Sequence, residues 1–141
     1  MTRVNVVPVK ELSDQWLIAE YRELPRVLKQ QISIENASDN YILGKGHIKW
    51  AKKHSLFTFN RYNIIIKEMH FRGFQVNFSN TLDKYINDEF KNHYKVTGDD
   101  IQLNRNRLIE KYNRNPTFYR WTKRKKPNYL KNSLLFHKNF I

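Results

Sequence analysis

Apolar residues recur every three or four positions near the start of the chain, the spacing that places them on one face of a helix. Ser13 or Asp14 can cap such a helix, because either side chain can accept hydrogen bonds from the free backbone N–H groups of the first turn. The pattern therefore predicts a helix from about Gln15 to Gln31 with one buried face. The residues of that face are Leu17, Tyr21, Leu24 and Leu28.

Pro25 lies inside this predicted helix. Proline has no N–H group and its ring clashes with the carbonyl four residues earlier, at a cost of about 3 kcal/mol in a helix interior. We therefore expect a kink or a break. Arg22, Glu23 and Arg26 fall opposite the apolar face. They form either a solvated ion-pair network or a functional face.

Two further helices are predicted by apolar residues at helical spacing. One runs from about Thr58 to Arg72 and stops at Gly73, and the other runs from about Asp99 to Asn113. A short helix is expected within residues 79–92, and the segment 40–50 is expected to be a turn because of its two glycines. The core positions predicted for these three helices are Tyr62, Ile65, Ile66 and Met69, then Leu82, Ile86 and Phe90, then Ile101, Leu108 and Tyr112.

No segment shows a strong strand pattern, so the predicted fold is all-α. A chain of 141 residues with 40% hydrophobic content suits one compact domain spanning residues 1–141. We expect about three main helices joined by long loops, with residues 118–141 as an extended basic and aromatic C-terminal tail.

Charge narrows the class of partner. The chain has 26 Lys and Arg against 13 Asp and Glu, a net charge of +13 that suits a nucleic acid. No apolar run of about eighteen residues and no signal peptide are apparent, so we expect no membrane association and a cytoplasmic location. The absence of cysteine excludes thiolate chemistry, and the five histidines form no metal-binding motif. We expect neither a metal nor a small-molecule cofactor.

The segment FYRWTKRKK, residues 118–126, alternates aromatic and cationic side chains. Aromatic rings can stack on bases for about 1 to 3 kcal/mol each, and cations bind phosphates with release of counterions. The alternative is that the aromatic residues pack in the core and the cations are solvated. The DNA-binding candidates in this segment are Arg120, Trp121, Lys123 and Arg124.

The chain starts with Met1-Thr2, and the small second residue permits removal of Met1. Thr2 would then carry a free α-amine. An α-amine has a pKa of about 7.7 to 8.0 against about 10.4 for lysine, so more of it is neutral at pH 7. Such an amine can form a Schiff base with a sugar carbon. By itself, however, this dipeptide is an ordinary start of a chain.

Several short segments of the chain form a recognisable series. They are TRVN (2–5), EL (11–12), DQ (14–15), AEYRELPRV (19–27), YILGKGH (41–47), RGF (72–74) and RNPTFY (114–119). In this order they closely resemble the phage pyrimidine-dimer DNA glycosylase family of the endonuclease V type. The N-terminal block matches without a gap over nearly thirty residues, which makes it highly specific.

This resemblance implies a glycosylase that is also an abasic-site lyase. In the family, the α-amine of the residue after Met attacks the anomeric carbon of the damaged nucleotide, expels the base and holds the sugar as an imine, and β-elimination then cuts the strand. Thr2 would supply this amine, Glu23 would stabilise the positive sugar and move protons, and Arg22 and Arg26 would grip phosphates. The further DNA contacts implied are Arg3, Gln15, Trp16, Lys45 and His47.

Three departures from the family pattern bear on the target. Trp16 stands where a member of the family has histidine, and it can either stack against DNA or turn into the core. The segment 28–41 is shorter and less basic, and the tail beyond Tyr119 is longer and more basic.

The sequence thus predicts a monomeric enzyme, phage-encoded if the resemblance extends to its source, that repairs damaged double-stranded DNA. Its expected target is the 5′ base of a cyclobutane pyrimidine dimer. Two alternatives stay open: the same chemistry on another damaged or modified base, and a non-catalytic basic nucleic-acid-binding protein on the same scaffold.

Overall fold

The computed structural model describes residues 3–77, 80–87 and 94–130. Every regular element within these residues is helical, which confirms the all-α prediction. None of the helices there has the length and apolar character needed to cross a membrane. The α-helices are α1 (Asp14–Lys29), α2 (His47–Lys53), α3 (Ser55–Phe71) and α4 (Gly98–Arg114), and the short 3-10 helices are η1 (Val9–Glu11), η2 (Asn80–Tyr85) and η4 (Pro116–Phe118).

Helix α1 begins where the sequence predicted. The Ser13 hydroxyl caps it by accepting a hydrogen bond from the Trp16 backbone N–H at 3.1 Å. Three of the four predicted apolar positions are fully buried, and Tyr21 is half-buried.

Of the two outcomes expected at Pro25, a kink or a break, the break is wrong, because α1 continues through this residue to Lys29. On either side of Pro25, Leu24 and Val27 are completely buried. Their burial contributes about 1.5 to 3 kcal/mol each, which offsets the cost of a proline in the helix.

Helices α3 and α4 confirm the two longer predictions. All four core positions expected in α3 are buried, and Gly73 follows the helix with a φ of 89°. Helix α4 buries Leu108 and Tyr112. Its cap is Thr97, whose hydroxyl accepts a hydrogen bond from the Asp100 backbone N–H at 3.1 Å.

Helix α2 was not predicted. Its seven residues follow a glycine turn in which Gly44 and Gly46 have φ values of 69° and 93°, so the expected turn covers only the start of this segment. The short helix expected within residues 79–92 is the 3-10 helix η2, which buries Leu82, while Phe90 lies outside the described residues.

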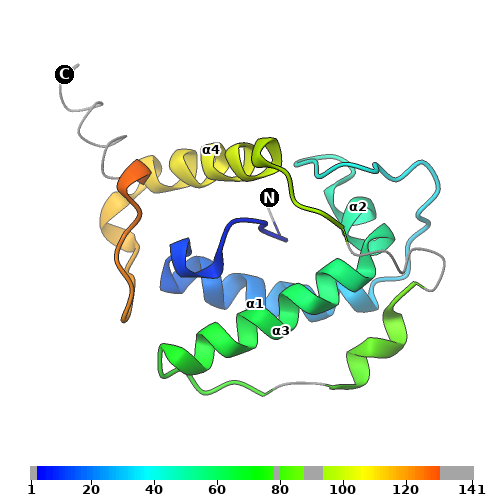
Figure 1. Cartoon of the computed structure of the whole chain (residues 1–141), viewed down its shortest axis with the longest axis horizontal. Helices are drawn as coiled ribbons and strands as arrows, with labels where there is room; N and C mark the ends of the chain where they lie inside the picture. Colours follow the sequence, from blue (N-terminus) through cyan, green and yellow to red (C-terminus); the bar gives the residue numbers. More distant parts are fainter. Residues whose placement is uncertain (1–2, 78–79, 88–93, 131–141) are drawn as a thin grey trace.

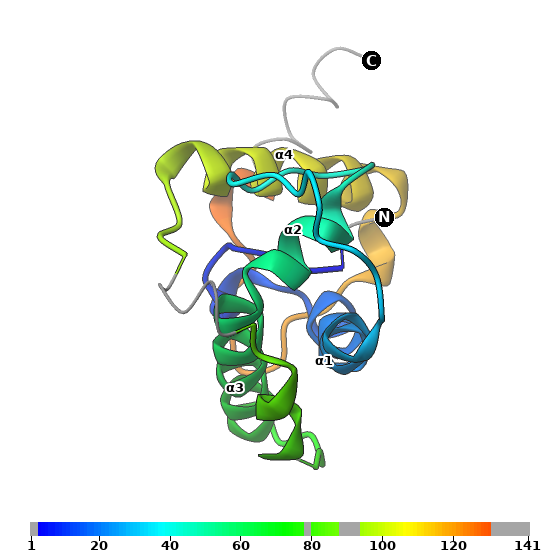
Figure 2. The same cartoon turned by 90° about the vertical axis from the view of Figure 1, so that its right-hand side faces the viewer.

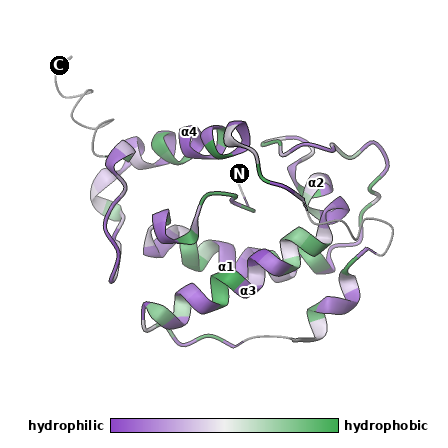
Figure 3. Cartoon of the chain, in the orientation of Figure 1, coloured by the Kyte–Doolittle hydropathy of each residue, from purple (hydrophilic) through white to green (hydrophobic). Residues whose placement is uncertain are grey.

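The N-terminal segment, which is the part of the described chain that precedes η1, is enclosed by the helices. In both views it lies between α4 on one side and the pair α1 and α3 on the other (Figures 1 and 2). Apolar and polar positions alternate along each of these helices (Figure 3). The segment after α4 runs back past the start of α1, where the Asp14 backbone N–H donates to the Arg120 carbonyl at 2.7 Å.

Candidate functional site

His47, the first residue of α2, holds the start of the described chain. Its Nε2 accepts hydrogen bonds from the backbone N–H groups of Arg3 at 3.2 Å and Val4 at 3.0 Å. Its Nδ1 lies 2.7 Å from the Ile42 carbonyl, to which it donates. This set of contacts requires a neutral ring with its proton on Nδ1.

Burial lowers the pKa of His47 and so favours the neutral ring. The residue is 1% exposed. This burial contradicts the expectation that His47 contacts DNA, because both ring nitrogens are used by the backbone and the side chain has almost no surface. His47 instead fixes the backbone at Arg3.

Glu20 holds the next residue of the segment. Its carboxylate accepts from the backbone N–H of Asn5 at 3.3 Å and from the Asn5 side-chain amide at 2.9 Å. Arg61 of α3 compensates this buried charge through its Nε at 2.9 Å, and its Nη1 donates to the Val7 carbonyl at 2.7 Å. Residues 5–7 are thereby tied to α1 and α3.

Asn104 of α4 completes the set of polar side chains that hold residues 3–7, which we call the polar cradle. Its side-chain oxygen accepts from the backbone N–H groups of Val6 at 2.7 Å and Val7 at 3.1 Å, and its amide donates to the Asn5 side chain at 2.8 Å. Asn104 is completely buried. Side chains from α1, α2, α3 and α4 therefore fix residues 3–7, a task that sequence spacing did not reveal.

Glu23 opens onto a cavity of about 420 Å³ beside this segment. One carboxylate oxygen lies 3.7 Å from Nε of Arg3, and the other lies 3.3 Å from Nη1 of Arg26. The Glu23 side chain is 21% exposed and the Arg26 side chain 73% exposed. The cavity is lined by Arg3, Asn5, Trp16, Ala19, Glu20, Arg22, Glu23, Arg26, Leu108 and Lys111.

The cavity thus brings together the predicted residues Arg3, Arg22, Glu23 and Arg26. Thr2, the expected source of the amine, lies outside the described residues. A carboxylate surrounded by cations can stabilise a positive sugar while the cations hold the phosphates on either side of it.

Lys111 also lines this cavity and was missed by sequence reasoning. Burial lowers the pKa of its amine, and the nearby Arg107 and Arg114 lower it further. Lys111 lies one helical turn after the buried Leu108, so the spacing of α4 contained a signal for its position.

Trp16 turns toward the core, which answers the question left open by the sequence. It is 7% exposed. The centroid of its ring lies 4.5 Å from the ring centroid of Tyr119 and 6.1 Å from that of Trp121. Trp16 therefore forms a wall of the cavity and joins α1 to the segment after α4.

Gln15 and Trp121 connect the same two parts of the molecule. The Gln15 side-chain oxygen accepts a hydrogen bond of 3.0 Å from the backbone N–H of Arg120, an exposed residue. The half-buried Trp121 donates its indole N–H to the Glu11 carbonyl at 2.9 Å.

The remaining candidates lie apart from Glu23. Lys45 is exposed and lines a different cavity, of about 380 Å³, at the glycine turn. Arg124 binds Glu68 through two contacts of 2.9 Å, while Lys123 is exposed. Across residues 3–77, 80–87 and 94–130, no three His, Asp or Glu side chains gather closely enough to hold a metal ion.

Comparison with known proteins assigns the family. The family model described as pyrimidine dimer DNA glycosylase matches residues 1–82, more than half of the 141 residues. The match includes Arg3, Glu23 and Arg26 of the cavity, together with His47 and Arg61, which hold the N-terminal segment. The chain therefore belongs to the pyrimidine dimer DNA glycosylase family of DNA repair enzymes.

Proposed function

We propose that this DNA repair glycosylase uses the α-amine of Thr2 to remove a base from a cyclobutane pyrimidine dimer and then cuts the strand as an abasic-site lyase. The observation that supports this most directly is the position of Glu23. Its carboxylate lies 3.7 Å from the guanidinium of Arg3, the residue that follows Thr2, and it lines a cationic cavity.

Base removal begins with attack of the neutral amine on C1′ of the damaged nucleotide. The bond from C1′ to the base nitrogen breaks, and this nitrogen keeps the electron pair and takes up a proton, while the base stays joined to its neighbour through the cyclobutane ring. Positive charge develops on the sugar, and the Glu23 carboxylate stabilises it. The same carboxylate accepts the proton that the attacking amine loses.

Strand cleavage follows from the covalent bond to the amine. The bond from C1′ to the ring oxygen O4′ breaks, O4′ takes up a proton, and the opened sugar is held as an imine between the amine nitrogen and C1′. Loss of a proton from C2′ forms a carbon–carbon double bond, and the C3′–O bond breaks so that the 3′ phosphate leaves with the electron pair. Water then hydrolyses the imine and releases the amine.

The cradle around residues 3–7 supports this role. A nucleophile at the end of a chain loses much of its advantage if it moves freely, because a catalytic group acts efficiently only when it is held in position. His47, Glu20 and Asn104 fix the backbone beginning at Arg3. The amine would therefore be attached to a rigid support.

The cations of the cavity would hold the DNA. Arg22 and Arg26 are exposed, and Lys111 lies on the opposite wall contributed by α4. Arginine binds phosphate oxygens through two parallel hydrogen bonds. Opening the duplex costs a few kcal/mol, and less at a poorly stacked lesion.

Borohydride trapping tests the proposal. The protein is incubated with dimer-containing, abasic and undamaged duplexes plus borohydride, after mass spectrometry has shown that Thr2 is the N-terminal residue. We expect a covalent adduct with the dimer duplex, and peptide mapping should locate it on the N-terminal peptide.

The outcomes separate the parts of the proposal. An adduct with the abasic duplex alone would reject the dimer as target, and an adduct on the Lys111 peptide would reject Thr2 as nucleophile. No adduct from correctly processed protein would reject the amine chemistry altogether.

A further inference from the structure

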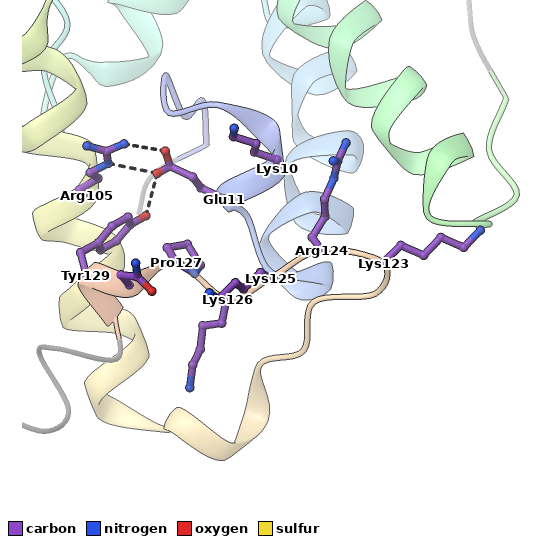
Figure 4. Close-up of a pocket in the computed structure, with 10 residues that line it drawn as sticks. Lys10, Glu11, Arg105, Lys123, Arg124, Lys125, Lys126, Pro127 and Tyr129 are labelled. Atoms are coloured by element: carbon purple, nitrogen blue, oxygen red, sulfur yellow. Dashed lines mark hydrogen bonds and ion pairs between the residues drawn. The ribbon is translucent and has the colours of Figure 1, made fainter.

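A second cavity, of about 590 Å³, lies between the segment after α4, helix α4 and η1 (Figure 4). None of its lining residues belongs to the Glu23 cavity. Six cationic side chains and one carboxylate line it. These residues are Lys10, Glu11, Arg105, Lys123, Arg124, Lys125, Lys126, Pro127, Asn128 and Tyr129.

The single carboxylate of the cavity is already bound. Glu11 accepts from Nε of Arg105 at 3.1 Å, from Nη2 of Arg105 at 2.6 Å, and from the Tyr129 hydroxyl at 3.0 Å. Arg105 and Tyr129 both point toward it in Figure 4. Glu11 therefore neutralises Arg105, and no other carboxylate among the described lining residues compensates the charge of the lysines.

Residues 121–129, which we call the cationic strap, are fastened to the body of the protein at alternate positions. The Thr122 hydroxyl donates to Asp14 at 2.6 Å. Arg124 binds Glu68, as described above. The Lys126 amine donates to the Tyr112 hydroxyl at 2.7 Å. The path of the strap is thus fixed by contacts with α1, α3 and α4.

Lys123 and Lys125 lie between these anchors and are exposed, as is Lys10 of η1. Among the residues that the structure describes, none bonds to the side chain of Lys123, Lys125 or Lys10. Lys123 has a φ of 58°, a left-handed conformation that is uncommon for a residue other than glycine. Such strain persists only where the surrounding structure imposes it, and it often marks a functional position.

We propose that Lys10, Lys123 and Lys125 bind backbone phosphates of the same DNA duplex whose damaged nucleotide binds at the Glu23 cavity. Lysine is a strong partner for phosphate, and a strap held in place by its neighbours loses little conformational freedom on binding. This contact rests on the proposed function only for the identity of the duplex. It lies largely outside residues 1–82, the part that the family model matches.

Helix α4 contributes a residue to each of the two cavities, Arg105 to the strap cavity and Lys111 to the Glu23 cavity. At 1.5 Å per residue these positions are about 9 Å apart along the helix axis. The two cavities therefore lie near each other along α4.

The salt dependence of binding tests the strap. The triple variant Lys10→Gln, Lys123→Gln, Lys125→Gln is compared with a control that also loses three charges, Lys67→Gln, Lys84→Gln, Lys95→Gln. Binding to an undamaged duplex is measured over a series of salt concentrations. Each phosphate contact contributes about 0.9 to the slope of log K against log salt concentration, so the strap variant should lose about 2.7.

A slope that is unchanged in the strap variant, or reduced equally in the control, would overturn the proposal. Thermal unfolding verifies that both variants are folded, and replacing the same three lysines by arginine should restore the slope. Because binding to undamaged DNA requires no amine chemistry, failure of the strap proposal can be distinguished from failure of the proposed glycosylase reaction.

Discussion

Two glutamates of α1 differ in burial and in what their carboxylates contact. Glu20 is 2% exposed, and its oxygens are taken by Asn5 and Arg61. Glu23, one turn later, lies at 3.3 and 3.7 Å from its cationic neighbours and faces a cavity. Glu20 therefore stabilises the fold, whereas Glu23 remains available to a substrate.

Replacing Glu23 by Gln should abolish base removal while preserving DNA binding. The amide keeps the shape of the side chain but neither stabilises a positive sugar nor accepts a proton, and such groups contribute about 10²- to 10⁴-fold to rates. Single-turnover cleavage of the glycosyl bond, detected as free base after photoreversal of the cyclobutane ring, measures the effect. The exposed Glu35→Gln change, made outside the cavity, is the matched control. Glycosyl bond cleavage by Glu23→Gln at the rate of that control would refute the assigned role.

At the scale of elements, the N-terminal segment depends on helices from the whole chain. Residues 3–7 make their polar contacts with α1, α2, α3 and α4 rather than with a neighbouring strand. Buried backbone groups without partners cost about 1 to 3 kcal/mol each, so these side chains are needed for the segment to be buried at all. His47 is the member of this set that can titrate near neutral pH.

The free energy of unfolding should fall as the pH is lowered from about 6.5. Burial lowers the pKa of His47 and of His54 in the folded protein, so the unfolded chain binds protons first and is favoured as the pH drops toward those lowered values. Chemical denaturation between about pH 5 and 7.5 measures this. His47→Gln should flatten the dependence, whereas the exposed His70→Gln should not. Equal slopes in wild type and His47→Gln would contradict the buried neutral ring.

At the scale of the whole molecule, Arg72 joins parts that are distant in sequence. Its guanidinium donates to Glu68 at 2.8 Å, to Asp14 at 3.0 Å and to the Val9 carbonyl at 3.2 Å. Glu68 and Asp14 also bind the cationic strap. One buried cation thus links α1, α3, η1 and the strap.

Arg72→Met should destabilise the protein by about 3 to 5 kcal/mol, because it leaves buried carboxylates without their main partner. Arg107→Met removes a more exposed ion pair with Glu110, at 3.0 Å, and should cost less than about 1 kcal/mol. Denaturant unfolding of the two variants compares them directly. Similar losses in both would show that Arg72 does not link these parts of the fold.

The hydrophobic pattern by itself determined the main helices and their buried faces, because helical spacing and capping are local properties of the chain. It also placed Arg22, Glu23 and Arg26 on one side of α1, since residues within one turn share a face. The seven-residue α2 escaped prediction, and the sequence left open whether Pro25 kinks or breaks α1, because packing from distant segments decides both.

Only the tertiary structure decided which contacts individual polar and aromatic residues make. His47 and Trp16 are buried, and Arg124 binds Glu68, although the sequence suggested DNA contacts for all three. Lys111 joins the Glu23 cavity from α4. The physical reason is that burial and charge pairing arise from contacts between residues far apart in the chain, and these contacts determine which charges remain available to a ligand.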